Sequence, residues 1–370
     1  MEVKTTIFPR ITKVWAKNFR SIESLELELE PLTVLVGPNA SGKSNIVDVL
    51  RFVSDAVRND LDSALTSRKE DHAARRSHSR RTFTDITIGF VIALENSSIE
   101  YEFVMRLYRD GRHKVVNEAA CVKLADHKDS EDWRIEIKGG RMVSPRLRRR
   151  PQEMPNALYD AMYSRSMVAS ATSDGTELAF PFSGFPFATA LISTVSFDDY
   201  LSIQRSLTES ASFLAEMRFY HIFPDALREP QLMASKYPLE ERGENLASVI
   251  GEMKRKNSSY FPELVTALSQ VVPGIQDVSV TAAGGYLVVR LLHGGNSSGG
   301  KGIWLDASQE SDGTLRTLGL LAALYQDPTP PFITIEEPEL TIHPGALAVL
   351  ADVILETSRR SSLLVTTHSP

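Results

Sequence analysis

The feature that most constrains this chain is the segment 37–44, which reads Gly-Pro-Asn-Ala-Ser-Gly-Lys-Ser and fits the pattern G-x-x-x-x-G-K-S. An apolar run at 32–36 precedes it, and residues 44–57 carry apolar side chains at helical spacing. A strand, a glycine-rich turn and a helix in this order are the context that a phosphate-binding loop requires. We therefore expect a nucleotide to bind here, in an α/β fold.

The chemistry explains the residue types in this loop. Glycines let the backbone curve until its N–H groups face the β-phosphate. Lys43 brings a positive charge to the β- and γ-phosphates, and the Ser44 hydroxyl coordinates Mg²⁺. The nucleotide-binding residues expected from this motif are Gly37, Pro38, Asn39, Ala40, Ser41, Gly42, Lys43 and Ser44.

A pair of carboxylates follows a second apolar run. Residues 332–335 are typical of a buried strand, and Glu336 and Glu337 come directly after it. In a protein with a phosphate-binding loop, we expect Glu336 to hold Mg²⁺ through water and Glu337 to polarise the attacking water. An acidic loop without a catalytic role is the plainer alternative.

Two more polar residues stand at the ends of predicted elements. His368 follows the apolar strand 363–367, where an imidazole can contact the γ-phosphate and sense its loss. Ser311 opens the helix predicted over 314–325, and a helix N-terminus with a free hydroxyl is an anion site. The plainer alternatives are a structural histidine and an N-cap serine. With Lys43 and Glu337, His368 completes the expected catalytic set.

These segments, in this order, resemble the ATP-binding-cassette (ABC) type of ATPase. The resemblance is closer to the branch that includes RecF, the SMC proteins and the OLD (overcoming lysogenisation defect) ATPases. The segments that carry it are 18–21 (Asn-Phe-Arg-Ser), 37–45, 311–316 (Ser-Asp-Gly-Thr-Leu-Arg), 335–339 (Ile-Glu-Glu-Pro-Glu), 343–344 (His-Pro) and 367–370 (Thr-His-Ser-Pro), with looser matches at 219–224 and 243–247.

The resemblance implies further roles. Arg20 and Asn45 match family positions near the nucleotide. Ser311 and Gly313 match the signature loop, which in this family contacts the γ-phosphate bound to the opposite subunit. ATP would then lie between two heads of a homodimer or higher oligomer, and the loop 339–343 would cross the dimer interface. The processes implied are DNA repair and antiphage defence, with DNA or a separate effector protein as partner.

The chain also departs from the family pattern. Gln152, Gln204 and Gln231 are candidates for the glutamine of the family's Q-loop, but none has a good sequence context. Ser311 lies far along the chain from Ser44, which predicts a large insertion between the two halves of the site. OLD nucleases carry a C-terminal Toprim nuclease domain, and this sequence shows none. Because a domain seldom ends directly after a strand, we expect the chain to be part of a longer protein.

The fold we expect is a P-loop ABC-type ATPase head with a mostly parallel core sheet, an antiparallel β layer and a helical or irregular insertion. Period-2 alternation predicts strands within 83–109 and 115–137, whereas the apolar run 32–36 predicts a strand buried on both faces. We also expect strands at 11–15 and 24–30, a surface excursion at 58–81, helix over 244–270, strands near 277–292 and a helix over 345–357. The predicted regions are an N-terminal ATPase lobe (1–140), an insertion (141–240) and a C-terminal ATPase lobe (241–370).

Composition narrows the class of protein. Apolar residues make up 42% of the chain and charged residues 24%, as in an ordinary soluble globular protein. The apolar runs are only strand-sized, so we expect no membrane span, and the first ten residues lack the apolar core of a signal peptide. Cys121 is the only cysteine, which fits a reducing cytoplasm.

The charge distribution leaves the question of DNA open. A net charge of −6 argues against a protein that binds nucleic acid over its whole surface. Two basic stretches, 68–81 and 141–150, are either DNA contacts or solvated loops.

Other functions fit less well or remain as alternatives. The chain lacks the Leu-Ser-Gly-Gly-Gln signature of a transporter ATPase and the Asn-Lys-x-Asp that specifies guanine. The alternative that remains is a nucleotide sensor or scaffold with low turnover, which controls a separate effector.

Overall fold

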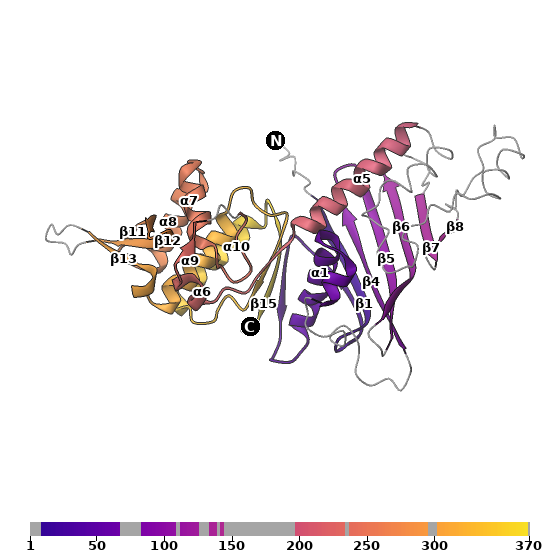
Figure 1. Cartoon of the computed structure of the whole chain (residues 1–370), viewed down its shortest axis with the longest axis horizontal. Helices are drawn as coiled ribbons and strands as arrows, with labels where there is room; N and C mark the ends of the chain where they lie inside the picture. Colours follow the sequence, from indigo (N-terminus) through magenta and orange to yellow (C-terminus); the bar gives the residue numbers. More distant parts are fainter. Residues whose placement is uncertain are drawn as a thin grey trace, which may run out of the picture. The chain divides into compact units, whose positions relative to one another are not determined.

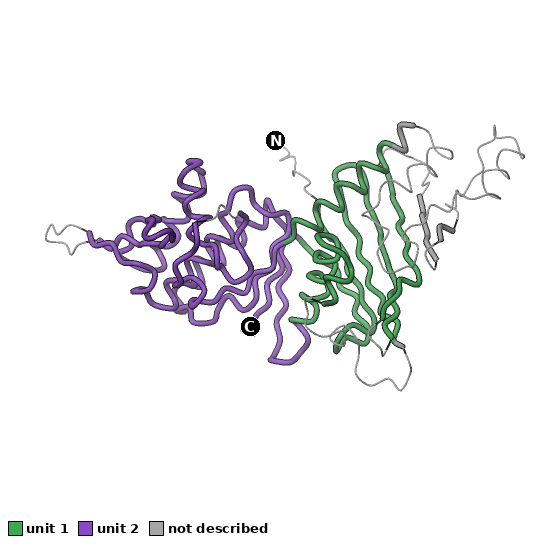
Figure 2. Tube along the Cα trace, in the orientation of Figure 1, with its two compact units in different colours: residues 1–30, 44–217 green, residues 31–43, 218–370 purple. Residues whose placement is uncertain are grey.

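A computed structural model describes residues 9–66, 83–108, 112–125, 133–138, 141–143, 197–233, 237–294 and 302–368. The chain forms two compact units (Figure 2). The first unit comprises Met1–Glu30 with Ser44–Met217, and the second comprises Pro31–Lys43 with Arg218–Pro370. The basic stretch 68–81 and residues 144–150 of the other lie outside the described residues.

The first unit is built on an antiparallel sheet of seven strands in the order β2-β1-β4-β5-β6-β7-β8 (Figure 1). This sheet confirms the antiparallel layer expected from the alternating sequence, and it also includes the two N-terminal strands. The strands are β1 (Arg10–Phe19), β2 (Ile22–Glu28), β4 (Phe83–Ala93), β5 (Ser97–Tyr108), β6 (His113–Leu124), β7 (Trp133–Lys138) and β8 (Arg141–Val143).

Helices cover this sheet through apolar contacts. Helix α1 (Lys43–Arg58) places the ring of Phe52 5.8 Å from that of Phe19 and 6.5 Å from that of Phe103. Helix α5 (Phe197–Glu216) packs on β5 and β6 (Figure 1). The prediction of a surface excursion over 58–81 is wrong for the start of that segment, because helix α2 (Leu61–Thr66) buries Leu61 and Leu65. With Ala64, three of its six residues are buried and apolar, which is enough to hold one short helix against a core.

The second unit contains the parallel sheet expected from the two apolar strands near the C-terminus. Its order is β3-β15-β14-β9, and every neighbouring pair is parallel. The strands are β3 (Leu32–Val36), β15 (Ser362–Thr367), β14 (Phe332–Glu336) and β9 (Arg218–Tyr220).

The prediction that β3 is buried on both faces is wrong. In the described part of the chain β3 pairs only with β15, and its side chains of Val34 and Val36 are 48% and 55% exposed. An apolar run shows that a strand is favoured, but it does not show whether the strand lies inside the sheet or at its edge.

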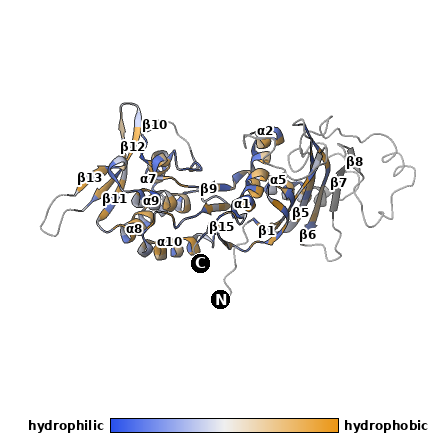
Figure 3. Ribbon diagram, turned by 90° about the horizontal axis from the view of Figure 1, so that it is seen from below, coloured by the Kyte–Doolittle hydropathy of each residue, from blue (hydrophilic) through white to orange (hydrophobic). Residues whose placement is uncertain are grey.

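Helices pack around α9 (Asp312–Tyr325), in which every residue from Thr314 to Tyr325 is buried. Its neighbours are α6 (Pro224–Arg228), α7 (Leu246–Arg255), α8 (Tyr260–Val271) and α10 (Pro344–Thr357). These bounds confirm the helices predicted over 244–270, 314–325 and 345–357, the first as two helices. Figure 3 colours much of α9 and α10 as hydrophobic, as expected for helices in a core.

A second small sheet completes this unit. Strands β10 (Gln231–Leu232), β11 (Ile275–Ala283), β12 (Tyr286–His293) and β13 (Ile303–Asp306) pair antiparallel, and the short helix η1 (Ala307–Gln309) follows. The predicted strands near 277–292 are confirmed. Among the described residues, no helix is long and apolar enough to cross a membrane.

Candidate functional site

The parallel sheet brings three of the predicted motifs to one edge. Strand β15 pairs with β3 through Thr367 and Val36, and with β14 through Thr366 and Glu336. Gly37, Glu337 and His368 each follow the last residue of one of these strands. Ligands in open α/β sheets bind outside the carboxyl ends of the strands, so this edge is the candidate site.

The loop after β3 curves tightly. The Ser41 amide donates to the Pro38 carbonyl at 3.3 Å, and Ala40 and Gly42 adopt positive φ angles of 62° and 97°. A Cβ on Gly42 would meet no atom within 4 Å. The glycine is therefore required by its left-handed backbone rather than by lack of space. Asn39, Ala40 and Ser41 are exposed at the turn of the loop.

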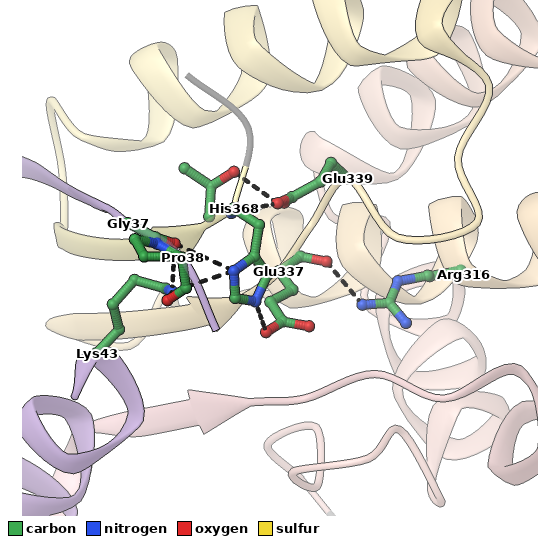
Figure 4. Close-up of polar contacts among 8 residues, drawn as sticks. Gly37, Pro38, Lys43, Arg316, Glu337, Glu339 and His368 are labelled. Carbon is green, nitrogen blue, oxygen red and sulfur yellow. Dashed lines mark hydrogen bonds and ion pairs between the residues drawn. The ribbon is translucent and has the colours of Figure 1, made fainter. Parts of the chain in front are cut away.

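The side chain of Lys43 is hydrogen-bonded to the backbone of this loop. Its ammonium donates to the Gly37 carbonyl at 2.7 Å and to the Pro38 carbonyl at 3.0 Å, and the residue is only 8% exposed. Nζ also lies 3.2 Å from Nδ1 of His368 (Figure 4). Lys43 must exchange these carbonyl oxygens for phosphate oxygens when it binds a nucleotide, because an ammonium has only three donors.

His368 connects the lysine to the predicted catalytic carboxylate. Its Nε2 contacts Oε1 of Glu337, and its Nδ1 lies 3.1 Å from the Gly37 carbonyl (Figure 4). In the tautomer with the proton on Nε2, the ring donates to Glu337 and accepts from Lys43. This tautomer satisfies both side-chain contacts without placing a second cation beside the ammonium.

The backbone of Glu337 is held on both sides. Its amide donates to the Thr366 carbonyl at 2.9 Å, and its own carbonyl accepts from Nη2 of Arg316 at 2.9 Å. The residue adopts a left-handed φ of 49°. Outliers of this kind persist only where the surroundings fix them, and they cluster at functional sites.

The contact of Arg316 with the Glu337 carbonyl was not predicted from the sequence. Burial lowers the pKa of its guanidinium, and the carboxylates of Glu337 and Glu339 act in the opposite direction. A signal was present in the sequence, since Arg316 is the one charged residue among residues 313–325.

Glu339 holds the backbone of His368, the residue that contacts Glu337. Its Oε1 accepts from the Thr367 hydroxyl at 2.6 Å and from the His368 amide at 2.8 Å. The resemblance assigns the loop 339–343 to a dimer interface, and within the chain Glu339 positions the end of β15.

The signature segment forms a capped helix start. The Ser311 hydroxyl accepts from the Thr314 amide at 3.2 Å, so Ser311 is the N-cap of α9. A Cβ on Gly313 would come within 2.9 Å of the Thr341 carbonyl, so this position tolerates only glycine without a shift. The contact of Ser311 and Gly313 with a nucleotide on a second subunit stays a prediction.

Three of the predicted residues belong to the first unit. Arg20 lies in the turn after β1 and forms an ion pair of 2.9 Å with Asp48 of α1. Asn45 donates to the Ser21 hydroxyl, and Ser44 is exposed in the first turn of α1.

The residues expected near Mg²⁺ offer oxygen ligands only. Glu336 supplies a carboxylate and Ser44 a hydroxyl, which are hard donors suited to this ion. Among the described residues, no group of three or more His, Cys, Asp and Glu side chains could hold a metal. A carboxylate and a hydroxyl are oxygen donors of the kind that Mg²⁺ takes beside the phosphate oxygens of a nucleotide.

No glutamine candidate reaches this edge of the sheet in the described residues. Gln152 lies outside them, and Gln204 is within α5. Gln231 accepts from the Ala247 amide at 2.8 Å, which is a structural contact within the second unit. The fourth strand of this sheet is β9, whose last residue, Tyr220, pairs with Ile335 of β14. His221 follows β9 and therefore lies at the same edge of the sheet. Sequence periodicity could not find His221, since β9 has only three residues.

Comparisons with known proteins agree with this architecture. Residues 32–370 match the family described as "AAA domain, putative AbiEii toxin, Type IV TA system". The Old nuclease of Escherichia phage P2 is 21% identical over 377 residues, which cover 97% of this chain and 56% of the nuclease. The DNA replication and repair protein RecF of Corynebacterium jeikeium (strain K411) is 38% identical over 66 residues, 17% of this chain and 16% of RecF.

A solved structure supports the fold. The SmcHead bound to the C-winged helix domain of ScpA aligns with a TM-score of 0.50 and 14% identity, covering 96% of this chain and 89% of that one. The chain spans about half the length of the Old nuclease that it matches. The chain thus belongs to the family described as "AAA domain, putative AbiEii toxin, Type IV TA system", and it is similar over most of its length to the Old nuclease of Escherichia phage P2.

Proposed function

We propose that this chain binds and hydrolyses ATP as an ABC-type head, and that ATP closes two heads into a dimer which hydrolysis reopens. The observation that carries the proposal is the line of contacts from Lys43 through His368 to Glu337. It brings a cation for phosphates, a residue that can sense the γ-phosphate and a carboxylate base to one edge of a parallel sheet. A structural cluster would not need Glu337 and His368 at strand ends and Lys43 at the start of the helix that follows the loop.

The residues divide the reaction among them. Lys43 and the N-terminus of α1 hold the β- and γ-phosphates, because both present positive charge. Ser44 and Glu336 would hold Mg²⁺, and the ion would supply positive charge to the phosphates. Glu337 accepts a proton from the attacking water. The oxygen of that water bonds to the γ-phosphorus, and the bond between the γ-phosphorus and the bridging oxygen breaks, with ADP as the leaving group. His368 keeps Glu337 oriented through Nε2.

Dimerisation follows from the signature segment. Ser311 and Gly313 lie at the positively polarised start of α9, which favours an anion. We propose that this anion is the γ-phosphate held by a second copy of the chain. The process proposed is DNA repair, in line with the name of the RecF relative, or antiphage defence, which only the resemblance to the OLD branch suggests. A cytoplasmic location is part of the proposal.

The second candidate is a nucleotide sensor with low turnover that controls a separate effector. The family description names a putative toxin of a type IV TA system and does not choose between the two candidates. The two candidates share the nucleotide site and differ in the rate of phosphate release.

The test measures phosphate release and oligomeric state in the same samples. We expect the chain with ATP and Mg²⁺ to release phosphate, and Glu337→Gln to abolish release while ATP holds the protein as a dimer in size-exclusion chromatography with light scattering. Glu356→Gln is the matched control, because Glu356 is exposed on α10. Dimer formation without phosphate release by the unmodified chain would favour the sensor. Absence of both would contradict the proposal.

A further inference from the structure

Arg316 is a charged side chain in the interior of an apolar helix. It is 2% exposed, and all of its neighbours from Thr314 to Tyr325 in α9 are buried. A buried guanidinium is unfavourable unless polar groups satisfy it. Replacement by an apolar residue would avoid that cost, so the position of Arg316 calls for an explanation beyond packing.

The partner of this guanidinium is the backbone of the proposed catalytic residue. Nη2 donates to the Glu337 carbonyl at 2.9 Å (Figure 4). Strand β15 holds the Glu337 amide through the Thr366 carbonyl. The Glu337 carbonyl also accepts from the Leu340 amide at 3.2 Å, so the turn after β14 and Arg316 hold it together in the left-handed conformation of Glu337. Arg316 is thus the side chain that helps to fix the backbone from which the Glu337 carboxylate reaches His368.

The same helix begins at the signature segment. Ser311 caps α9, and five helical residues rise about 7.5 Å, so Arg316 lies little more than one turn from the cap. Gly313 packs so closely on the Thr341 carbonyl that a Cβ would fall 2.9 Å from it. The helix start and the loop after β14 thus touch at two points, one at Gly313 and one at Arg316.

The guanidinium also retains an unused donor. Its Nε is buried and has no hydrogen-bond partner among the described residues. Both Glu337 and Glu339 attract its charge. A small shift of α9 can therefore change which acceptors Arg316 uses without exposing it to water.

We propose that Arg316 is a positioning residue that couples the signature segment to Glu337 within one chain. This inference rests on the proposed function. In the proposed dimer each chain offers Ser311 to the nucleotide of its partner and Glu337 to its own nucleotide. Arg316 then links the two sites, so that filling one site orients the carboxylate of the other and hydrolysis becomes cooperative.

The experiment compares Arg316→Met and Arg316→Lys with the unmodified chain. Phosphate release is measured against ATP concentration, and nucleotide binding with a fluorescent ATP analogue. For Arg316→Met we expect kcat to fall by about tenfold or more with KM changed less than about threefold, since the lost contact acts on orientation and not on binding. We expect the Hill coefficient to fall from above 1 to 1. Arg316→Lys should restore part of kcat, because it keeps the charge but not the planar fork.

The matched control is Arg360→Met. Arg360 donates to the Leu324 carbonyl at 3.2 Å at the other end of α9, and its guanidinium lies over the Tyr260 ring. This control should lower the thermal unfolding temperature but leave kcat and the Hill coefficient unchanged. A purely structural role for Arg316 predicts the same result for Arg316→Met, and that result would overturn the proposal.

Failure of the coupling and failure of the proposed function give different results. If Arg316→Met does not fold, Arg316→Lys decides alone, and a folded lysine variant with unchanged kcat and Hill coefficient overturns the coupling. If the unmodified chain neither hydrolyses ATP nor dimerises, the proposed function has failed, and the coupling inferred from it falls as well. Hydrolysis with a Hill coefficient of 1 in the unmodified dimer would contradict the coupling but leave the proposed function intact.

Discussion

The antiparallel sheet of the first unit and the parallel sheet of the second use polar residues in opposite ways. On the antiparallel sheet, polar side chains pair across strands, as Arg106 does with Asp85 through two hydrogen bonds of 2.7 and 2.8 Å. On the parallel sheet the strand interiors are uncharged and mostly apolar, with Thr334 and Thr366 buried among them, and charged residues gather at the ends of the strands and on the turns after them. Cross-strand pairs satisfy one another, whereas groups such as Lys43 bond to carbonyls that a ligand can replace.

This difference predicts a division of effects. Substitutions at the ends of the parallel strands should change turnover with little change in stability. Substitutions inside the antiparallel sheet should change stability with little change in turnover for each folded molecule. The following experiments test that division.

The largest effect is expected for Lys43→Ala. The variant loses the charge proposed to face the β- and γ-phosphates, so the free energy of ATP binding should weaken by about 2–5 kcal/mol, roughly 30-fold to several thousand-fold in Kd. Isothermal titration with an ATP analogue measures it. Lys17→Ala, an exposed lysine of β1, is the control and should bind normally. If the two variants bind the ATP analogue with equal affinity, the proposal that this loop binds phosphate is wrong.

A core substitution in the antiparallel sheet should act on stability instead. Phe90 is 2% exposed, and its ring lies 5.2 Å from that of Tyr101. Phe90→Ala should lower the free energy of unfolding by about 3–5 kcal/mol. Urea unfolding followed by circular dichroism measures the loss. The division between the sheets is wrong if kcat for each folded molecule falls together with stability.

A buried hydrogen bond in the same sheet should give a smaller, pH-dependent effect. The Tyr101 hydroxyl donates to Oε1 of Glu118 at 2.7 Å, and burial raises the pKa of Tyr101 well above its usual value. Tyr101→Phe should cost about 1–3 kcal/mol, because it leaves a buried carboxylate without its donor.

The direction of the pH dependence follows from the raised pKa. The folded state keeps the phenol proton that the unfolded state loses near pH 10, so this stabilisation is complete below pH 10 and declines as the pH rises further. Tyr101→Phe should remove this part of the alkaline loss of stability. An identical alkaline slope in thermal unfolding of both proteins would show that Tyr101 does not titrate as its burial implies.

The smallest effect on stability is expected at Ser311, where it separates two roles. Ser311→Ala removes the N-cap of α9 and should cost about 1 kcal/mol. Ser311→Asp keeps a capping oxygen, so stability should be retained, but it adds a negative charge where the γ-phosphate is proposed to bind. Thermal unfolding and phosphate release are measured together. Full activity of the aspartate variant would leave Ser311 as a cap only.

The parts of the fold that the sequence predicts are those with long, repeated patterns. The apolar runs of β14 and β15 place these strands within a residue or two, and the alternation places β4 and β5 together within 83–109 without locating the turn between them. Strands β9 and β10 have three and two residues, which is too short for any period, and they form because a neighbouring strand offers a free edge. The same limit hid His221, whose place is set by β9.

The candidate site divides along a similar line. Motif spacing predicts which residues follow strands, so Lys43, Glu337 and His368 could be named in advance. It does not predict contacts between segments, such as the bonds of Glu339 to Thr367 and His368. The edge position of β3 was also out of reach, because apolar content reports the preference for strand and not the number of neighbours.

The left-handed backbone of Glu337 has a consequence for the evolution and engineering of this protein. A residue with a Cβ loses about 1–2 kcal/mol in this conformation, whereas glycine adopts it freely. Glu337→Gly relieves this strain, but the greater conformational freedom of glycine in the unfolded chain and the lost contact with His368 offset the gain. Stability should therefore change little while the proposed base is lost, so a laboratory selection for thermostability alone would not detect the loss and needs a parallel screen for activity.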